Sequence, residues 1–408
     1  MQLQRRRFLV GMATATALLM PGCRDPARYT EADVRALAAQ RKRELEESGS
    51  GPFGLQRYAG YRGLADLPYF ELDESRTLRC TVPDLPAVLD IHAHLGISLL
   101  LAPELDLLAR KDRVEHILDC DAEDPGCPLD LDVYINANFR PSDMRSLHWN
   151  AVAQLLWGSK KESTHTIPNL IGEMDATGIA QAMILPIAFG LPFGDNLTEQ
   201  FMAAIKSAAV GDRLLLGASV HQSDPDATGK LHRFAKAGAR MVKLHPAGAR
   251  FFPDAEEMFP IYRACAELGL PVIFHGGRAG IEPEYTHQFT LIRHYEGALR
   301  AFPDVQFVLA HAGARDVEDA IALADRYPNL WYGTHGQGVT MLARLIKEVG
   351  PDRLMFGSDW PFYHLAASLA KVLIVTEGNP DARYALLRGS GERLLGLDPT
   401  KTPVASKT

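Results

Sequence analysis

The sequence predicts an α/β fold, a (β/α)8 barrel, because short apolar runs alternate with amphipathic stretches from residue 87 to residue 396. The amphipathic stretches are about 10–15 residues long, as expected of the helices in βα units. Eight strands and seven intervening helices favour a closed barrel. The alternative, an open doubly wound sheet, would carry a Gly-rich phosphate loop after its first strand, and this sequence has none there.

The predicted elements follow one another in regular order. The strands are expected at Ala87–His92, Ala180–Ile187, Leu214–His221, Met241–His245, Pro271–His275, Val305–His311, Leu330–Thr334 and Arg353–Ser358. The clearest helices between them are expected at Asp226–Ala237, Asp254–Leu268, Leu291–Ala301, Val317–Tyr327 and Val339–Val349.

The connection after the first strand is unusually long. A structureless loop of this length would count against the fold, so residues 97–165 are interpreted as an inserted lid subdomain over the C-terminal mouth of the barrel. Helical segments are predicted within it at Ser98–Leu118 and Met144–Gly158.

The first 23 residues have the pattern of an export signal. Arg5–Arg7 precede a short apolar stretch and resemble a twin-arginine signal, and Gly22-Cys23 resembles a lipoprotein cleavage site. We therefore expect a periplasmic or cell-envelope lipoprotein held to a membrane by a lipid at Cys23. The alternative is an uncleaved amphipathic N-terminus.

Two further segments flank the barrel. Residues 24–86 form an N-terminal extension and linker, in which helical spacing predicts a charged surface helix over Thr30–Glu47. Residues 397–408 are a tail.

The composition is that of a globular protein with a sizeable core, at 408 residues, 47% hydrophobic and 23% charged. The formal net charge of −7, without a basic stripe, argues against a nucleic-acid partner and leaves a small-molecule substrate as the expected one. Self-association into a homo-oligomer stays open. Among five cysteines, Cys120 and Cys127 could form a disulfide outside the cytoplasm or remain free thiols. A cysteine-based zinc site is not expected, since no CxxC repeat occurs.

Ionisable residues gather where the predicted strands end. The first strand ends in Asp90-Ile91-His92-Ala93-His94, whose alternation places its acid and two histidines on one face. Later strands end at His245, His275, His311, His335 and Asp359. The C-terminal strand ends of a barrel converge on one place, and imidazole and carboxylate are ligands of zinc and similar divalent ions. A single histidine at a strand end is usually a packing residue, but the repetition in successive units predicts a metal site.

These motifs resemble those of the amidohydrolase superfamily, in the amidohydrolase-related branch that includes aromatic-acid and semialdehyde decarboxylases. The matching motifs are Asp90-x-His92-x-His94, Val242-Lys243-Leu244-His245-Pro246, His275-Gly276-Gly277, Ala310-His311-Ala312-Gly313 and Gly357-Ser358-Asp359-Trp360-Pro361. The resemblance implies that His92, His94, His275 and Asp359 hold a divalent metal and that His311 acts at the substrate.

The expected chemistry is hydrolysis of an amide, lactone or ester by a metal-bound hydroxide, with one Zn²⁺ favoured. Asp359 would take the proton of the attacking water, and His311 or the metal would polarise the carbonyl. Asp90 would fix a ligand imidazole or the strand itself. In binuclear relatives a carboxylated lysine bridges two metals, so Lys243 and His311 are the additional ligands of a two-metal alternative. Some relatives hydrolyse lactones without metal.

Further residues at the mouth are candidates for binding substrate. Arg250 and Arg278 could hold a substrate carboxylate, or be surface arginines on loops. The other candidates are His245, His335 and Trp360. Two alternatives to hydrolysis remain: a non-oxidative decarboxylase on the same scaffold, and a non-catalytic surface binding protein.

Overall fold

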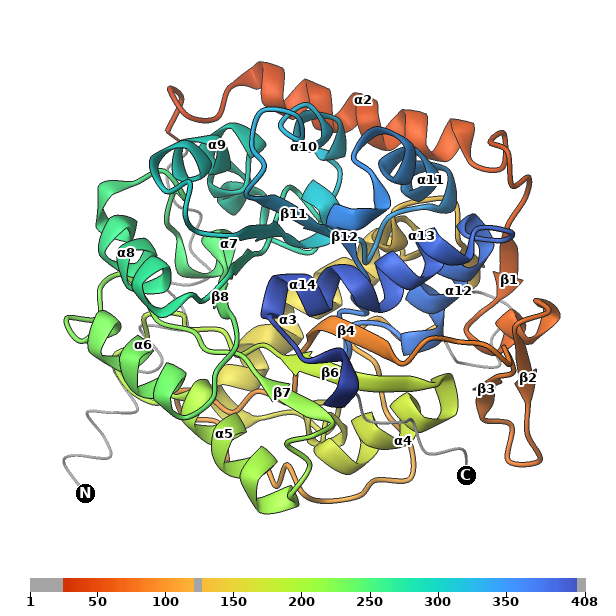
Figure 1. Cartoon of the computed structure of the whole chain (residues 1–408), viewed down its shortest axis with the longest axis horizontal. Coiled ribbons are helices and arrows are strands. Elements are labelled where there is room, and N and C mark those ends of the chain that lie inside the picture. Colours follow the sequence, from red (N-terminus) through yellow and green to blue (C-terminus); the bar gives the residue numbers. More distant parts are fainter. Residues whose placement is uncertain (1–24, 121–126, 402–408) are drawn as a thin grey trace.

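A computed structural model of the chain describes residues 25–120 and 127–401 (Figure 1). Eight short parallel strands surround a common centre, with helices outside them. The strands are β4 (Val88–Ala93), β6 (Ile179–Ile184), β7 (Leu214–Leu216), β8 (Val242–Leu244), β9 (Val272–Phe274), β10 (Phe307–Leu309), β11 (Leu330–Gly333) and β12 (Leu354–Met355). Each falls within or overlaps a predicted strand, which confirms the predicted fold class.

Hydrogen bonds join the strands in sequence order and connect the two ends of this series. The runs β4-β6-β7 and β8 to β12 are continuous sheets. Ala218 bridges to Val242 between β7 and β8, and Ala93 bridges to Trp360 beyond β12. The amide of Ile91 also donates to the carbonyl of Phe356 at 3.0 Å. The barrel is therefore closed through both seams.

Helices cover the outside of the barrel with their apolar faces turned inward. They are α4 (Ile167–Thr177), α5 (Leu197–Ala208), α6 (Ala227–Lys236), α8 (Phe259–Leu268), α9 (Ile292–Ala301), α10 (Val317–Ile321), α11 (Val339–Glu348) and α12 (Leu365–Val375). The helix predicted over Val317–Tyr327 is shorter than expected and ends at Ile321. The short α14 (Ser390–Leu395) closes one barrel end, where Leu394 and Leu395 pack against the interior side chains of β4 and its neighbours.

The connection after β4 contains one of its two predicted helices. The predicted helix Met144–Gly158 corresponds to α3 (Pro141–Trp157). The predicted helix Ser98–Leu118 is wrong, because the chain there runs through loops and turns. Pro103 interrupts the segment and cannot donate the backbone bond that a helix requires. The disulfide between Cys120 and Cys127 is present, with the two Cα atoms 5.5 Å apart.

The N-terminal extension is bound to the barrel. Its helix α2 (Glu31–Glu47) begins at Thr30, which forms a capping box with Asp33, so the predicted helix over Thr30–Glu47 is confirmed. It lies across α9, α10 and α11 (Figure 1). A buried ion pair between Glu44 and Arg315, with 3.0 Å between Oε2 and Nε, connects its far end to the barrel loops.

A second tie connects the extension to the insertion. Strand β1 (Arg57–Ala59) pairs antiparallel with β5 (Pro128–Asp130). The predicted export signal, including Cys23, and most of the tail lie outside the described residues. None of the helices in the described ranges has the length and apolar character needed to cross a membrane.

Candidate metal centre

Three predicted ligands converge at one point of the barrel mouth. The Nε2 atoms of His92 and His94 are 3.1 Å apart, and they lie 3.5 and 3.4 Å from Oδ1 of Asp359. All three side chains are buried. Donor atoms at such mutual distances surround a point at which a single ion could touch all of them.

The strand β4 positions the two histidines despite an irregular register. Leu89 and Ile91 point into the apolar interior of the barrel, and the pairing with β6 shifts between Asp90 and Ala93. The Nδ1–H of His94 donates to the carbonyl of Leu185 at 2.6 Å, so its Nε2 keeps a lone pair directed at Asp359.

Asp90 connects the first and the last strand. Its carboxylate accepts hydrogen bonds from the amides of His92 and Ser358, at 2.9 and 3.0 Å, and from the Ser358 hydroxyl. Burial raises the pKa of Asp90 to about 7, against the opposing effect of these hydrogen bonds. Asp90 thus holds β4 against the Ser358–Asp359 turn, so of its two predicted roles the structure shows the fixing of the strand.

Asp359 sits in a strained turn. Its φ of 62° is in the left-handed region, and its amide donates to the carbonyl of His92 at 2.8 Å. Burial alone would raise the pKa of Asp359, but its contact with His94, and then the nearby His335 and Lys243, lower that pKa below its usual value. The carboxylate is therefore ionised at neutral pH.

His311 and His335 form a second group around the same Asp359. The ring centroid of His335 is 4.2 Å from those of both His92 and His311. Both ring nitrogens of His335 are buried without a hydrogen-bond partner among the described residues. Burial lowers the pKa of His335 to about 3, so the ring is neutral and able to bind a cation.

His311 is held by its neighbours in an unusual backbone conformation. Its φ is 58°, and its Nδ1 lies 3.1 Å from the hydroxyl of Tyr134. Gln337 donates to its carbonyl oxygen at 2.6 Å. Burial, and then the neighbouring His335, lowers the pKa of His311 well below its ordinary value.

Lys243 lies at the bottom of the site on β8. Its Nζ is 3.1 Å from Nε2 of His92, so this candidate of the two-metal alternative lies beside a predicted ligand. Burial lowers its pKa to about 7, while the charge of Asp359 opposes the shift.

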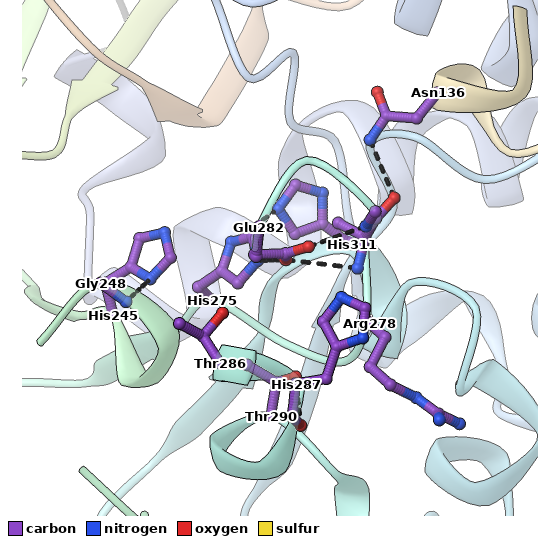
Figure 2. Close-up of polar contacts among 12 residues, drawn as sticks. Asn136, His245, Gly248, His275, Arg278, Glu282, Thr286, His287, Thr290 and His311 are labelled. Carbon is purple, nitrogen blue, oxygen red and sulfur yellow. Dashed lines mark hydrogen bonds and ion pairs between the residues drawn. The ribbon is translucent and has the colours of Figure 1, made fainter. Parts of the chain in front are cut away.

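Both ring nitrogens of His275 lie close to neighbouring side chains, which Figure 2 draws. Its Nε2 pairs with Glu282, and its Nδ1 lies 3.2 Å from Nε2 of His311. His245 stacks on the ring of His275 at a centroid distance of 4.1 Å, and its own Nδ1 accepts from the amide of Gly248. The structure therefore groups His275 with Glu282 and not with the mutually close donors of His92, His94 and Asp359.

Arg278 does not face the site. Figure 2 shows its side chain extending away from His275 and Glu282. The guanidinium is buried against Asp316, with 3.0 and 2.9 Å between its Nε and the two carboxylate oxygens. The predicted substrate contact at Arg278 is therefore not supported, because a buried bidentate ion pair occupies the side chain.

Replacing Arg278 with methionine should destabilise the fold, because it leaves the buried carboxylate of Asp316 unpaired. We expect the free energy of unfolding to fall by about 3–5 kcal/mol, measured by urea denaturation. The matched control is Arg293→Met, at a half-exposed pair with Asp33, where a loss of about 0–1 kcal/mol is expected. Unchanged stability with a raised KM would instead place Arg278 at the substrate.

Two further candidates for substrate binding, Arg250 and Trp360, lie in different surroundings. Arg250 lines a cavity next to the histidines, and its guanidinium donates to the hydroxyl of Tyr285 at 3.0 Å. Trp360 is fully buried, and its indole donates to Glu173 at 3.2 Å. Trp360 thus supports the turn that carries Asp359.

The sequence reasoning missed three residues at this site. They are Tyr134, Glu173 and Glu282, which bond to His311, Trp360 and His275. Glu282 follows the end of β9 by only a short loop, and an acid at that place could have been considered. Tyr134 and Glu173 belong to the insertion and to α4, and no local pattern connects them to the strand ends.

The residues present fit a divalent ion. The group consists of nitrogen and carboxylate donors, one ring is oriented by a backbone carbonyl, and His335 has buried nitrogens without partners among the described residues. The donor set suits zinc and also manganese or iron, so it does not identify the metal.

Comparison with known proteins yields a family match and structural likenesses. A family model described as "Amidohydrolase" matches residues 172–397. An uncharacterised TIM-barrel protein from Bordetella bronchiseptica is 20% identical with a TM-score of 0.53, covering 76% of this chain and 98% of its own. A 2,6-dihydroxybenzoate decarboxylase complexed with 2,6-dihydroxybenzoate is 18% identical with a TM-score of 0.50, covering 76% and 100%.

A third solved structure is described as a hydrolase. It is a probable 2-pyrone-4,6-dicarboxylic acid hydrolase from Acinetobacter baumannii, 13% identical with a TM-score of 0.47, covering 76% of this chain and 100% of its own. At these identities the likenesses concern the fold. Comparison with curated protein sequences finds no match.

Proposed function

Because this chain belongs to the amidohydrolase family, we propose that it is a metal-dependent hydrolase that cleaves a C–N or C–O bond in an amide, lactone or ester. The observation that carries the proposal is the buried group of His92, His94 and Asp359, whose carboxylate is ionised beside two imidazole nitrogens. We propose one Zn²⁺ as its ion. When bound, such an ion supplies Lewis-acid activation of water and of a carbonyl oxygen.

The chain's own residues supply the proton transfers. Asp359 has a lowered pKa and accepts the proton of the attacking water at its carboxylate, then passes it to the leaving nitrogen or oxygen. The neutral ring of His311, positioned by Tyr134, would exchange its Nε2 contact with His275 for an N–H donated to the carbonyl oxygen on which negative charge develops. The carbonyl of Leu185 accepts the Nδ1–H of His94, which orients the ring with its Nε2 toward Asp359.

The test combines metal content with turnover. We would measure metal by plasma mass spectrometry on the protein from residue 24, with His92→Ala and Lys243→Ala beside it, and assay a panel of amides, lactones, esters and aromatic acids. One metal per chain, lost in His92→Ala and kept in Lys243→Ala, together with hydrolysis, is the expected result. Release of CO₂ from the acids instead would make the protein a decarboxylase, and ligand binding without turnover would make it a binding protein.

We also propose that the enzyme works in the cell envelope, on the basis of residues 1–23. The full-length protein should then sediment with membranes, and Cys23→Ser should release it into the soluble fraction. Equal sedimentation of both forms would contradict a lipid anchor at that residue.

A further inference from the structure

A cavity of about 330 Å³ adjoins the metal centre. Its wall contains Phe362, whose ring centroid lies 6.4 Å from that of His94, and Glu282, which pairs with His275. Its volume is at the lower end of the range for small-molecule sites, about 300–1,000 Å³. A substrate whose reacting carbonyl meets Asp359 would therefore place the rest of its body here.

Hydrocarbon groups form most of the cavity wall. The side chains come from the loops after β4, β6, β8, β9 and β12 and from α3 of the insertion. The apolar ones that matter for the argument are Ile97, Leu99, Ile117, Leu147, Leu191 and Ile281. Apolar surface in a site stabilises a bound group in proportion to the hydrocarbon that it removes from water.

The charges of the four charged side chains in the wall sum to zero, and each of these side chains has a hydrogen-bond or ion-pair partner. Lys161 donates to the carbonyls of His116 and Ile117, at 2.9 and 3.2 Å. Glu162 accepts from the amide of Ile97 at 2.9 Å, and Glu282 pairs with His275. Arg250 donates to the hydroxyl of Tyr285 at 3.0 Å. Two positive and two negative groups leave the described part of the wall without net charge.

We propose that this cavity binds an uncharged hydrocarbon body, either an acyl chain or an unsubstituted ring, of the amide, lactone or ester that the enzyme cleaves. The proposal rests on the hydrolase function above and names the class of its substrate. A substrate with two carboxylates would bring both charges beside Glu162 and Glu282, in a wall whose cationic groups already have hydrogen-bond partners. Burying such charges without new partners is costly, whereas an apolar body meets no such cost.

The test uses a series of nitrophenyl esters whose acyl chain grows from acetyl to octanoyl. A matched series of esters carries a carboxylate at the far end of the acyl chain. We expect kcat/KM to rise about fourfold for each methylene until the cavity is filled, because each buried methylene contributes about that factor to binding. The carboxylated esters should be slower than their uncharged counterparts of equal length.

Two variants on one helix test whether the dependence of kcat/KM on chain length arises in the cavity. Leu147→Gln, at the cavity wall on α3, should flatten the dependence on chain length. Trp157→Gln, on the same helix with its side chain 64% exposed, should leave it unchanged. The corresponding methyl ketones, which cannot be hydrolysed, give a binding readout through the thermal midpoint of unfolding.

The outcomes separate this inference from the proposed function. Binding of long ketones without hydrolysis of any ester would support the cavity assignment and contradict the hydrolase. Hydrolysis that favours the carboxylated esters, and that Arg250→Met abolishes, would overturn the cavity assignment and leave the hydrolase standing. Hydrolysis that is indifferent to chain length would overturn it as well.

Discussion

The Asp359→Asn variant is expected to lower kcat by about 10²–10⁴-fold, the usual contribution of a positioned acid–base group. The amide keeps an oxygen close to the Nε2 atoms of His92 and His94 but cannot take a proton from water at neutral pH. The measurement is kcat at saturating substrate and metal, with metal content determined on the same sample. If the variant keeps its metal, the fall in kcat comes from the lost base; if the metal content also falls, the fall in kcat includes loss of the ion.

The control for this variant is Asp352→Asn, because Asp352 forms an exposed pair with Arg393 and its side chain is 78% exposed. We expect its kcat to match that of the unaltered protein. If Asp359→Asn kept its metal and turned over at the normal rate, the proton transfer would belong to another group and the assignment of Asp359 as base would be wrong.

The second large effect is expected in the metal affinity of the histidine variants. His92→Ala should lose the metal, and His335→Ala should weaken binding more than His275→Ala does. The reason is that the nitrogens of His335 have no hydrogen-bond partner among the described residues, whereas His275 is bonded to Glu282 and lies 3.2 Å from His311. Replacing a residue that only orients a ligand usually lowers metal affinity about 10–100-fold, and replacing a ligand itself should lower it further.

This experiment would use titration with Zn²⁺ against a chelating indicator, so its readout does not depend on turnover. His232→Ala, on α6, serves as the control because this residue lies outside the histidine group. The reverse order, with His275→Ala the weaker binder, would show that His275 leaves Glu282 to bind the ion, as the resemblance to the family implies. Loss of a second metal in Lys243→Ala would favour the two-metal alternative.

The sequence alone was sufficient for the fold, and it predicted that the candidate site residues lie at the strand ends. Strand and helix periodicity is a local property, and each of the eight strands overlaps its predicted range. The same is true of the histidines and of Asp359, since each stands where its own strand ends. A barrel then brings the strand ends together, so His92, His94, His311 and Asp359 could be expected to meet before any coordinates were known.

The tertiary structure decided which atoms face one another, because those contacts join residues far apart in the chain. Arg278 and Asp316 are 38 residues apart, and their ion pair removes an arginine that the sequence left available to substrate. Tyr134 reaches His311 across 177 positions. The apolar cavity likewise exists only where α3 of the insertion meets the barrel loops. Periodicity along the chain predicts the face on which a residue lies, but only the packing of distant segments determines what that face meets.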